Sequence, residues 1–374
     1  MRRKIIFIVD YILSKIINVL YVIPINVFRL YSSEDLYRHP SYFPEKKQKT
    51  VGRMFWEQCI QIFKYGYANE YYFMYGYDVK NATEQKQYLH YAPFMRRRDE
   101  LNLASKHNST CILRDKLYFG VFADAFSIPT AKNIVYSTDK GLYLLQERKY
   151  ISLQEFVTRD NYKLFCKLID GECGNGIFVL EIVDGKIFYD GKEITVDELK
   201  NRLNSKRYLF QEFIHQHAAM SQLYDRAINS IRLVTVRDLR TNNIVVLPSI
   251  LRIGANGNIV DNTSQGGIAV GFDLNTGQLH KYGFYKPQFG LKVDRHPNSG
   301  IIFENFYIPY IQEAINEAKR FHSLLSDIHS IGWDIAIGEN GPIFIEGNDN
   351  WEINGPQIGN HGLKKEFERY FYVN

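Results

Sequence analysis

Residues 332–348 decide the fold of this chain, and they read GWDIAIGENGPIFIEGN. Apolar and polar residues alternate on both sides of a central ENG turn, which is typical of two antiparallel strands joined by a tight turn. If the turn centres on Asn340, Asp334 lies directly opposite Glu346, and Asn348 lies two residues further along the same face. The sequence therefore predicts a hairpin that brings two carboxylates and an amide oxygen together.

Two carboxylates held that close repel each other, so a cation is their natural partner. All three side chains offer oxygen, which Mg²⁺ prefers when it bridges nucleotide phosphates. We therefore predict a magnesium site at Asp334, Glu346 and Asn348. The alternative is a hairpin face exposed to water, but the apolar neighbours Ile335 and Phe344 favour a buried pair of strands.

A second polar feature lies in residues 165–176, which read FCKLIDGECGNG and place Lys167 within an otherwise apolar strand. A buried ammonium group needs an anion nearby. The glycines Gly174 and Gly176 allow backbone N–H groups to approach an anion closely. A lysine strand followed by a glycine-rich flap suits the phosphates of a nucleotide, and an ordinary hairpin with an exposed lysine is the alternative. The pattern is not a P-loop, because the lysine precedes the glycines and no helix follows.

Further candidates lie between these two motifs. Arg232 stands between apolar residues of a predicted strand, where a guanidinium meets a phosphate or a carboxylate, or forms a structural salt bridge. His217 is a candidate for contact with the ribose or phosphates of a nucleotide, with a structural role as the alternative. One loop contains Asp261, Asn262, Gly266 and Gly267. This loop is either the lining of an acceptor pocket or a plain turn.

The apolar patterns divide the chain into four segments. Residues 1–110 are predicted to be mainly helical, and residues 111–160 to form a linker and the start of a central subdomain. Residues 161–215 are predicted as a small α+β subdomain that carries the glycine-rich flap. Residues 216–374 are predicted as a larger subdomain with the metal site, including a long helix over 305–325.

Composition and charge narrow the class of protein. Hydrophobic residues make up 45% and charged residues 23%, as in folded proteins, and the net charge of +5 is spread along the chain. This charge favours anionic partners such as nucleotides over nucleic acid. The four cysteines form no CxxC pair, which fits a reduced, cytoplasmic protein. The apolar segment 5–28 is interrupted too often to span a membrane, so it packs on the protein or makes a peripheral contact with the inner face of the membrane.

The order of these features resembles the ATP-grasp superfamily, whose members clasp ATP between two α+β subdomains. A lysine strand is followed by a glycine flap, a hinge, an Asp strand and a Glu-x-Asn strand. The resemblance covers roughly residues 110 to 355 and implies an α+β, ATP-grasp fold preceded by a helical region. It implies that Lys116 and Lys167 bind the phosphates of ATP. It also implies an adenine-binding hinge at Gln211, Glu212, Phe213 and Ile214.

More narrowly, the chain resembles the sugar-transfer-associated ATP-grasp group found with polysaccharide biosynthesis. The segments that carry this resemblance are His215–His217, Asn229–Thr235, Asp261-Asn262 with Gly266-Gly267, and the Gly-Trp-Asp and Glu-Gly-Asn strands. We expect Asn229, Arg232 and the 261–267 loop to contact the substrate. Many ATP-grasp ligases carry an arginine two residues before the metal-binding Asp, whereas this chain has Gly332. Arg232 or Arg252 must then supply, together with Lys167, the positive charge that phosphoryl transfer needs.

The resemblance implies an enzyme that joins a carboxylate to an amine with ATP. In such an enzyme ATP phosphorylates the carboxylate, and the amine attacks the acyl-phosphate in a site with Mg²⁺ and fixed positive charge. The expected substrates are a sugar acid or another capsule or cell-surface glycan precursor, and an amino acid or another amine. Two other functions stay open: a kinase that phosphorylates a hydroxyl group, and a nucleotide-binding factor in capsule assembly that has no turnover.

Overall fold

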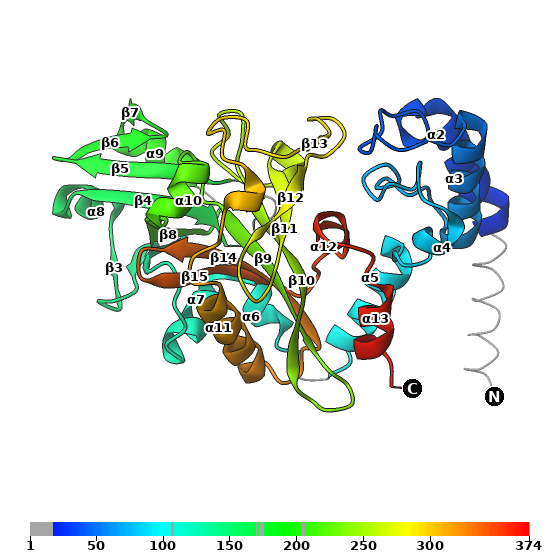
Figure 1. Ribbon diagram of the computed structural model, residues 1–374. Coiled ribbons are helices and arrows are strands. Elements are labelled where there is room, and N and C mark those ends of the chain that lie inside the picture. The colour runs from blue at the N-terminus through cyan, green and yellow to red at the C-terminus, as the bar shows by residue number, and fades with distance from the viewer. Residues whose placement is uncertain (1–17, 106–107, 170, 172–175, 204–205, 374) are drawn as a thin grey trace.

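A computed structural model describes residues 18–105, 108–169, 171, 176–203 and 206–373. Two antiparallel β-sheets form its centre, and a group of helices built from the N-terminal part lies at the opposite end from the first sheet (Figure 1). The predicted mixed α+β class with a helical N-terminal region is confirmed. Gly174 and residues 1–17, on which part of the sequence-based predictions fell, lie outside the described residues.

The helices fall into three groups along the chain. The N-terminal helices are α2 (Ile23–Ser32), α3 (Val51–Tyr65), α4 (Ala82–Gln85), α5 (Tyr91–Asn102), α6 (Thr110–Arg114) and α7 (Lys116–Ala125). The helices of the middle part are α8 (Leu153–Arg159), α9 (Val196–Leu203) and α10 (Ala218–Leu223). The C-terminal helices are α11 (Ile311–Leu324), α12 (Asn354–Gly359) and α13 (Lys364–Phe371). Every helix in the described part of the chain is too short or too polar to cross a membrane.

The first sheet has the strand order β3-β2-β1-β8-β4-β5-β6-β7. Its strands are β1 (Asn133–Thr138), β2 (Gly141–Leu144), β3 (Lys149–Ile151), β4 (Tyr162–Leu168), β5 (Phe178–Val183), β6 (Lys186–Tyr189), β7 (Lys192–Ile194) and β8 (Tyr208–Glu212). The inward side chains of α8 and α9, Phe156 and Leu199, pack with Leu180 and Phe210 of the strands in one apolar core. The sheet therefore draws strands from both predicted segments, 111–160 and 161–215.

The second sheet has the strand order β13-β12-β11-β10-β9-β14-β15. Its strands are β9 (Ser230–Arg237), β10 (Ile244–Ile253), β11 (Ile268–Phe272), β12 (Leu279–Phe284), β13 (Lys292–Val293), β14 (Ser330–Gly338) and β15 (Gly341–Asn348). Every residue of β14 is buried. Helix α11 covers one face of the sheet, where Phe321 stacks on Trp333 with ring centroids 4.7 Å apart.

The two faces of β9 meet different neighbours because side chains alternate along a strand. Ile231 and Leu233 point into the core beneath α11. Val234 and Val236 point to the other side, into a core with Phe94 of α5 and Phe367 of α13. Ser230 and Arg232 share the face of Val234 and Val236, but they lie beyond the part that these helices cover. The exposed part of this face is therefore polar and forms the floor of a cleft.

The predicted helix over 305–325 begins later than expected. Residues Phe303–Asn305 form a short 3₁₀ turn, and α11 starts at Ile311 after Tyr310, whose φ is 54°. The intervening residues pair with the start of β12, since Leu279 N donates to Phe306 O at 3.0 Å. This pairing uses a backbone carbonyl that would accept a hydrogen bond within a helix, so the helix does not begin here. The local pattern of apolar residues does not predict the pairing.

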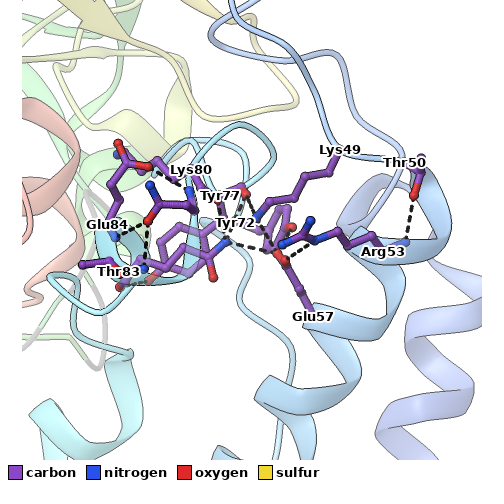
Figure 2. A network of polar contacts seen from close by, with 11 residues as sticks. Lys49, Thr50, Arg53, Glu57, Tyr72, Tyr77, Lys80, Thr83 and Glu84 are labelled. Carbon is purple, nitrogen blue, oxygen red and sulfur yellow. Dashed lines mark hydrogen bonds and ion pairs between the residues drawn. The ribbon is translucent and has the colours of Figure 1, made fainter.

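The N-terminal helices are tied together and docked on the C-terminal part by polar contacts. Glu57 of α3 accepts hydrogen bonds from Lys49 Nζ at 2.8 Å and Tyr72 Oη at 2.6 Å (Figure 2). Tyr75 Oη donates to Asn354 Oδ1 of α12 at 2.7 Å, and Gln357 Nε2 donates to Tyr75 Oη at 3.0 Å. The tyrosine-rich segment 71–77 therefore lies against α12, at the edge of the cleft.

Candidate functional site

A row of charged side chains crosses three neighbouring strands of the second sheet. Arg232 of β9 pairs in register with Asp334 of β14, and Asp334 pairs with Glu346 of β15. The predicted opposition of the two carboxylates is confirmed, although the turn is not centred on Asn340. Gly338 pairs with Gly341 across a two-residue turn, and a bulge between Asp334 and Ile335 then shifts the register by one residue. The bulge is what places Glu346, and not Ile345, opposite Asp334.

Two guanidinium groups hold the buried Asp334 carboxylate. Arg232 Nε donates to Asp334 Oδ1 at 2.5 Å and Arg232 Nη2 donates to Oδ2 at 3.1 Å. Arg252 Nη2 of β10 lies 2.9 Å from the same Oδ2. Burial alone raises the pKa of Asp334, but Arg232 and Arg252 outweigh burial and hold this pKa well below its usual range. Asp334 therefore remains ionised, and both arginines are oriented toward the cleft.

Glu346 has a different environment from Asp334, although the two are adjacent. Burial and the nearby Asp334 charge raise the pKa of Glu346, and Arg232 and Lys167 only partly offset this. Asn348 Nδ2 donates to Glu346 Oε1 at 3.3 Å, so the amide lies beside the carboxylate on the same face. A buried carboxylate that is destabilised as an anion is a favourable place for an added cation. The donors of Asp334, Glu346 and Asn348 thus fit Mg²⁺.

The fit rests on these two carboxylates and one amide. Within the described ranges no group of three or more His, Cys, Asp and Glu side chains gathers closely enough to hold a metal ion. Two oxygens of protein carboxylates leave most of the coordination sphere of Mg²⁺ to water and phosphate, which is its common mode of binding at nucleotide sites.

Two lysines, one from the first sheet and one from helix α7, face this row. Lys167 of β4 is only 6% exposed, and burial lowers its pKa to about 8, while Glu346 raises it and Lys116 lowers it. Lys116 is the first residue of α7 and its Nζ donates to Gly171 O at 2.5 Å. Two cations thus meet where the strand β4 ends and the glycine-rich segment begins. Gly176 lies at the far end of that segment with φ 72°.

The residues predicted as a hinge lie where β8 ends. Gln211 Nε2 donates to Asn133 Oδ1 at 2.6 Å, and the backbone N–H of Glu212 donates to Lys132 O at 2.9 Å. Phe213 meets Phe165 edge to face, with ring centroids 6.1 Å apart. Ile214 continues the chain toward the second sheet. These four residues, Gln211 to Ile214, form one wall of the cleft beside the lysines.

A second network orients Arg252 from the opposite side. Asp261 Oδ2 accepts from Ser230 N at 2.9 Å and Ser230 Oγ at 2.5 Å. Ser230 Oγ in turn accepts from Arg252 Nη2 at 2.7 Å. Burial raises the pKa of Asp261, and Arg252 lowers it less strongly. Gly267 lets the loop close on itself, because a Cβ there would lie 2.1 Å from Asp261 O. Asn262 lines the cleft beside Asp261, and Gly266 has φ 92°.

One cleft of about 1310 Å³ gathers most of the predicted residues. Its lining includes Lys116, Lys167, Gln211, Glu212, Phe213, Ile214, Arg232, Arg252, Asp261, Asn262, Asp334, Glu346 and Asn348. These side chains come from β4, β8, β9, β10, β14 and β15, from the start of α7 and from the loops after β8 and β10, so both sheets face the same space. The volume exceeds the roughly 300–1,000 Å³ of a typical ligand pocket and leaves room for more than one ligand.

The structure does not bring His217 or Asn229 to the cleft. The Nδ1 atom of His217 accepts from Ala219 N at 3.1 Å and caps α10. Asn229 is fully buried, where its Nδ2 donates to Met220 O at 2.9 Å and Tyr224 O at 2.8 Å, and its Oδ1 accepts from Gly254 N at 3.2 Å. Both side chains hold the framework beneath the cleft.

The position of Gly332 has a structural reason. A Cβ at this residue would lie 2.6 Å from Trp351 Cβ and 3.4 Å from Arg232 Cδ. The side chain of Arg232, from the neighbouring strand β9, therefore lies next to the space that a side chain at position 332 would occupy. Arg232 provides the positive charge next to Asp334 that an arginine at 332 would provide in many ATP-grasp ligases.

Sequence reasoning missed several residues of the cleft. Ser230 was not among the predicted site residues, but its hydroxyl joins Asp261 to Arg252. Tyr71 and Met74 of the N-terminal region line the cleft near Ile358 of α12. The tyrosine-rich composition of residues 71–77 was the only signal in the sequence for this contact, and it does not specify which surface the segment covers.

A lysine-bearing sheet and an acidic hairpin that face each other across one cleft define the class of ATP-grasp proteins. The chain belongs to the family described as sugar-transfer associated ATP-grasp, which matches residues 96–370. The predicted ATP-grasp fold and the narrower resemblance are thereby confirmed. No curated protein matches this chain.

Solved structures show partial similarity. One is an N5-carboxyaminoimidazole ribonucleotide synthetase in complex with ADP, with a TM-score of 0.40 and 12% identity over 71% of this chain and 53% of that chain. A D-alanine–D-alanine ligase from Helicobacter pylori has a TM-score of 0.40 and 12% identity over 70% of this chain and 61% of that chain. An L-amino acid ligase from Bacillus licheniformis has a TM-score of 0.36 and 11% identity over 67% of this chain and 43% of that chain. The present chain thus spans about half the length of the first of these proteins.

Proposed function

We propose that this protein is an ATP-dependent ligase that joins a carboxylate to an amine through an acyl-phosphate. The observation that supports this most strongly is the charged row Arg232–Asp334–Glu346, which shares one cleft with the buried Lys167. Such a row places fixed positive charge directly beside a pair of carboxylates suited to a divalent cation. Phosphoryl transfer between two anions needs both.

Each group has a distinct role in the proposed reaction. Lys116 and Lys167 bind phosphate oxygens of ATP, and the wall from Gln211 to Ile214 holds the adenine. Asp334, Glu346 and Asn348 would hold Mg²⁺, whose positive charge would neutralise phosphate oxygens of ATP. Arg232 and Arg252 stabilise the negative charge on the transferred phosphoryl group. Asp334 already orients both guanidinium groups toward the cleft.

In the proposed reaction the acid substrate binds beside Arg252, at the end of the cleft toward Asp261. In this position a carboxylate oxygen of the substrate attacks the γ-phosphorus of ATP, and ADP leaves. The amine then displaces phosphate from the acyl-phosphate and forms the amide. The walls of the cleft, which come from both sheets, would exclude water from the acyl-phosphate.

The proposed substrates follow from the family and remain a proposal. They are a sugar acid or another precursor of a cell-surface or capsule polysaccharide, and an amino acid or another amine. We further propose that the protein acts in the cytoplasm, where ATP is available, with a peripheral contact at the inner face of the membrane. The free thiols of Cys59, Cys111 and Cys166 fit a reducing compartment.

The test is a screen for ADP release with sugar acids combined with amino acids and polyamines. Hydroxylamine is included in parallel, because it converts an acyl-phosphate into a hydroxamate. We expect acid-dependent ADP release that Asp334→Asn and Lys167→Ala abolish and that Lys186→Ala, at the exposed start of β6, retains. If both site variants keep the wild-type rate, the assigned site is wrong. Amine-independent ADP release with a stable phosphoester product would identify a kinase instead.

A further inference from the structure

Two N-terminal helices expose apolar stripes to solvent. In and just before α2, the exposed side chains recur every three or four residues, and the most exposed are Phe28 and Tyr31, at 70% each. In α3 the same spacing relates Trp56, Ile60 and Phe63, which are 66%, 58% and 63% exposed. The α2–α3 apolar face consists of Leu20, Tyr21, Ile25, Phe28, Tyr31, Trp56, Ile60 and Phe63.

These stripes are not needed for the core of the N-terminal region. The opposite sides of the same helices already supply that core, with Leu30 from α2 and Met54, Cys59 and Ile62 from α3. Single exposed apolar residues are normal on protein surfaces, but two stripes on helices that contact each other are typical of an interaction surface. The face therefore calls for a partner outside the described fold.

The charge around this face is positive. The ionisable groups of α2 and α3 with full charges at neutral pH are Arg29, Arg53, Lys64 and Glu57. Glu57 is neutralised within the protein, because Lys49, Arg53 and Tyr72 all donate to it (Figure 2). Arg29 and Lys64 are exposed and form no ion pair within the described ranges. Of the acidic residues that follow α2, Glu34 pairs with Arg38 at 3.1 Å and Asp35 is exposed, so the unpaired charge beside the face is positive on balance. A partner with negative charge beside an apolar layer complements this surface.

We infer that the α2–α3 apolar face docks on the surface of an anionic lipid bilayer. Aromatic rings with neighbouring lysine and arginine side chains are the combination that settles at the headgroup level of such membranes. A second copy of the chain is a poorer partner, since a two-fold contact would bring the same positive charges together. Helices α2 and α3 lie at the end of the molecule away from the first sheet (Figure 1), so docking leaves the cleft accessible. This inference assigns a surface to the proposed peripheral membrane contact, and it is independent of the proposed ligase activity.

The tryptophans provide a direct readout. The chain has three, of which Trp333 and Trp351 are 0% and 1% exposed, whereas Trp56 is 66% exposed. The full-length protein is mixed with vesicles of phosphatidylglycerol and phosphatidylcholine, or of phosphatidylcholine alone. With anionic vesicles we expect a blue shift of the tryptophan emission, protection from acrylamide and co-sedimentation that weakens with added salt.

Matched variants locate the contact. Ile60→Ser combined with Phe63→Ser keeps Trp56 as the probe and should weaken co-sedimentation at least tenfold, with an unchanged thermal unfolding curve. Tyr307→Ser, at an aromatic residue 54% exposed far along the chain, should bind as the wild type does. Equal binding to both vesicle types, or no binding, overturns the inference. Emission that is already blue-shifted and protected without vesicles also overturns it, because the face is then covered by the chain itself or by a second copy.

Discussion

Replacing Lys167 with methionine should stabilise the ligand-free protein while it abolishes nucleotide binding. Lys167 is buried, and burial lowers its pKa from the ordinary value of 10.5 to about 8. A drop of about 2.5 in pKa corresponds to roughly 3 kcal/mol of unfavourable free energy for the charged form, at about 1.36 kcal/mol per unit. Methionine has a similar length and no charge, so it removes this penalty.

Part of the gain is offset because Glu346 loses an attractive neighbour and its own pKa is already raised. We therefore expect a net stabilisation of about 1–3 kcal/mol at pH 7. Between pH 8 and 10.5 unfolded lysine holds more protons than folded Lys167, so wild-type stability rises with pH in this window. The advantage of the variant is fully present below pH 8 and disappears as the pH approaches 10.5.

Urea unfolding at pH 7 and pH 9.5 measures both quantities, and a thermal shift with Mg·ATP measures binding. Lys163→Met is the matched control for stability on the same strand, since Lys163 is exposed and contacts Glu181 at 2.8 Å and the Phe213 ring at 5.3 Å. This control should stay within about 0.5 kcal/mol of the wild type at both pH values. A Lys167→Met protein that is less stable at pH 7, or that still gains stability from Mg·ATP, would refute the reasoning.

Three further substitutions test the site. Gly332→Ala should lower the free energy of unfolding in urea by about 1–3 kcal/mol. The added Cβ would lie 2.6 Å from Trp351 Cβ, and Trp351 is held in place by Ser330 and Phe94. The control Gly52→Ala, where a Cβ would meet nothing within 4 Å, should be neutral or slightly stabilising. Asn229→Ala should cost about 2–3 kcal/mol by leaving buried partners unpaired, without a change in the KM for ATP. Glu346→Gln should stabilise the ligand-free protein at pH values above the ordinary glutamate pKa of 4.5, because the raised pKa of Glu346 means that its ionisation is unfavourable in the folded state. The same variant should abolish the Mg²⁺ dependence of ATP binding in calorimetry.

The hairpin from β14 to β15 shows how far local sequence carries the prediction. Alternation of apolar and polar residues was sufficient to identify two strands, their turn and the face that Asp334 and Glu346 share. The reason for their opposition was different, since a two-residue turn and a bulge before Ile335 together produce the register. The pattern of apolar and polar residues would be the same with or without this bulge, so the sequence could not predict the bulge.

The contacts of Arg252, Ser230 and Asp261 were not predictable in the same way. The three side chains come from β10, β9 and the loop before β11, and their meeting depends on which strands pair. The guanidinium next to Asp334 depends likewise on the pairing of β9 with β14, which joins residues about a hundred positions apart. The sequence restricted the source of positive charge to Arg232 or Arg252, and the structure shows that both contact Asp334.

The sequence alone showed the order of motifs that resembles the ATP-grasp family, because hydrophobic alternation and glycine-rich turns are properties of neighbouring residues. Strand order and register decided the rest, since they join distant residues and are set by packing of the whole sheet. For that reason only the tertiary structure shows that Arg232 lies next to Gly332. It also shows that Asn229 and His217 lie outside the cleft, whereas Tyr71 and Met74 line it.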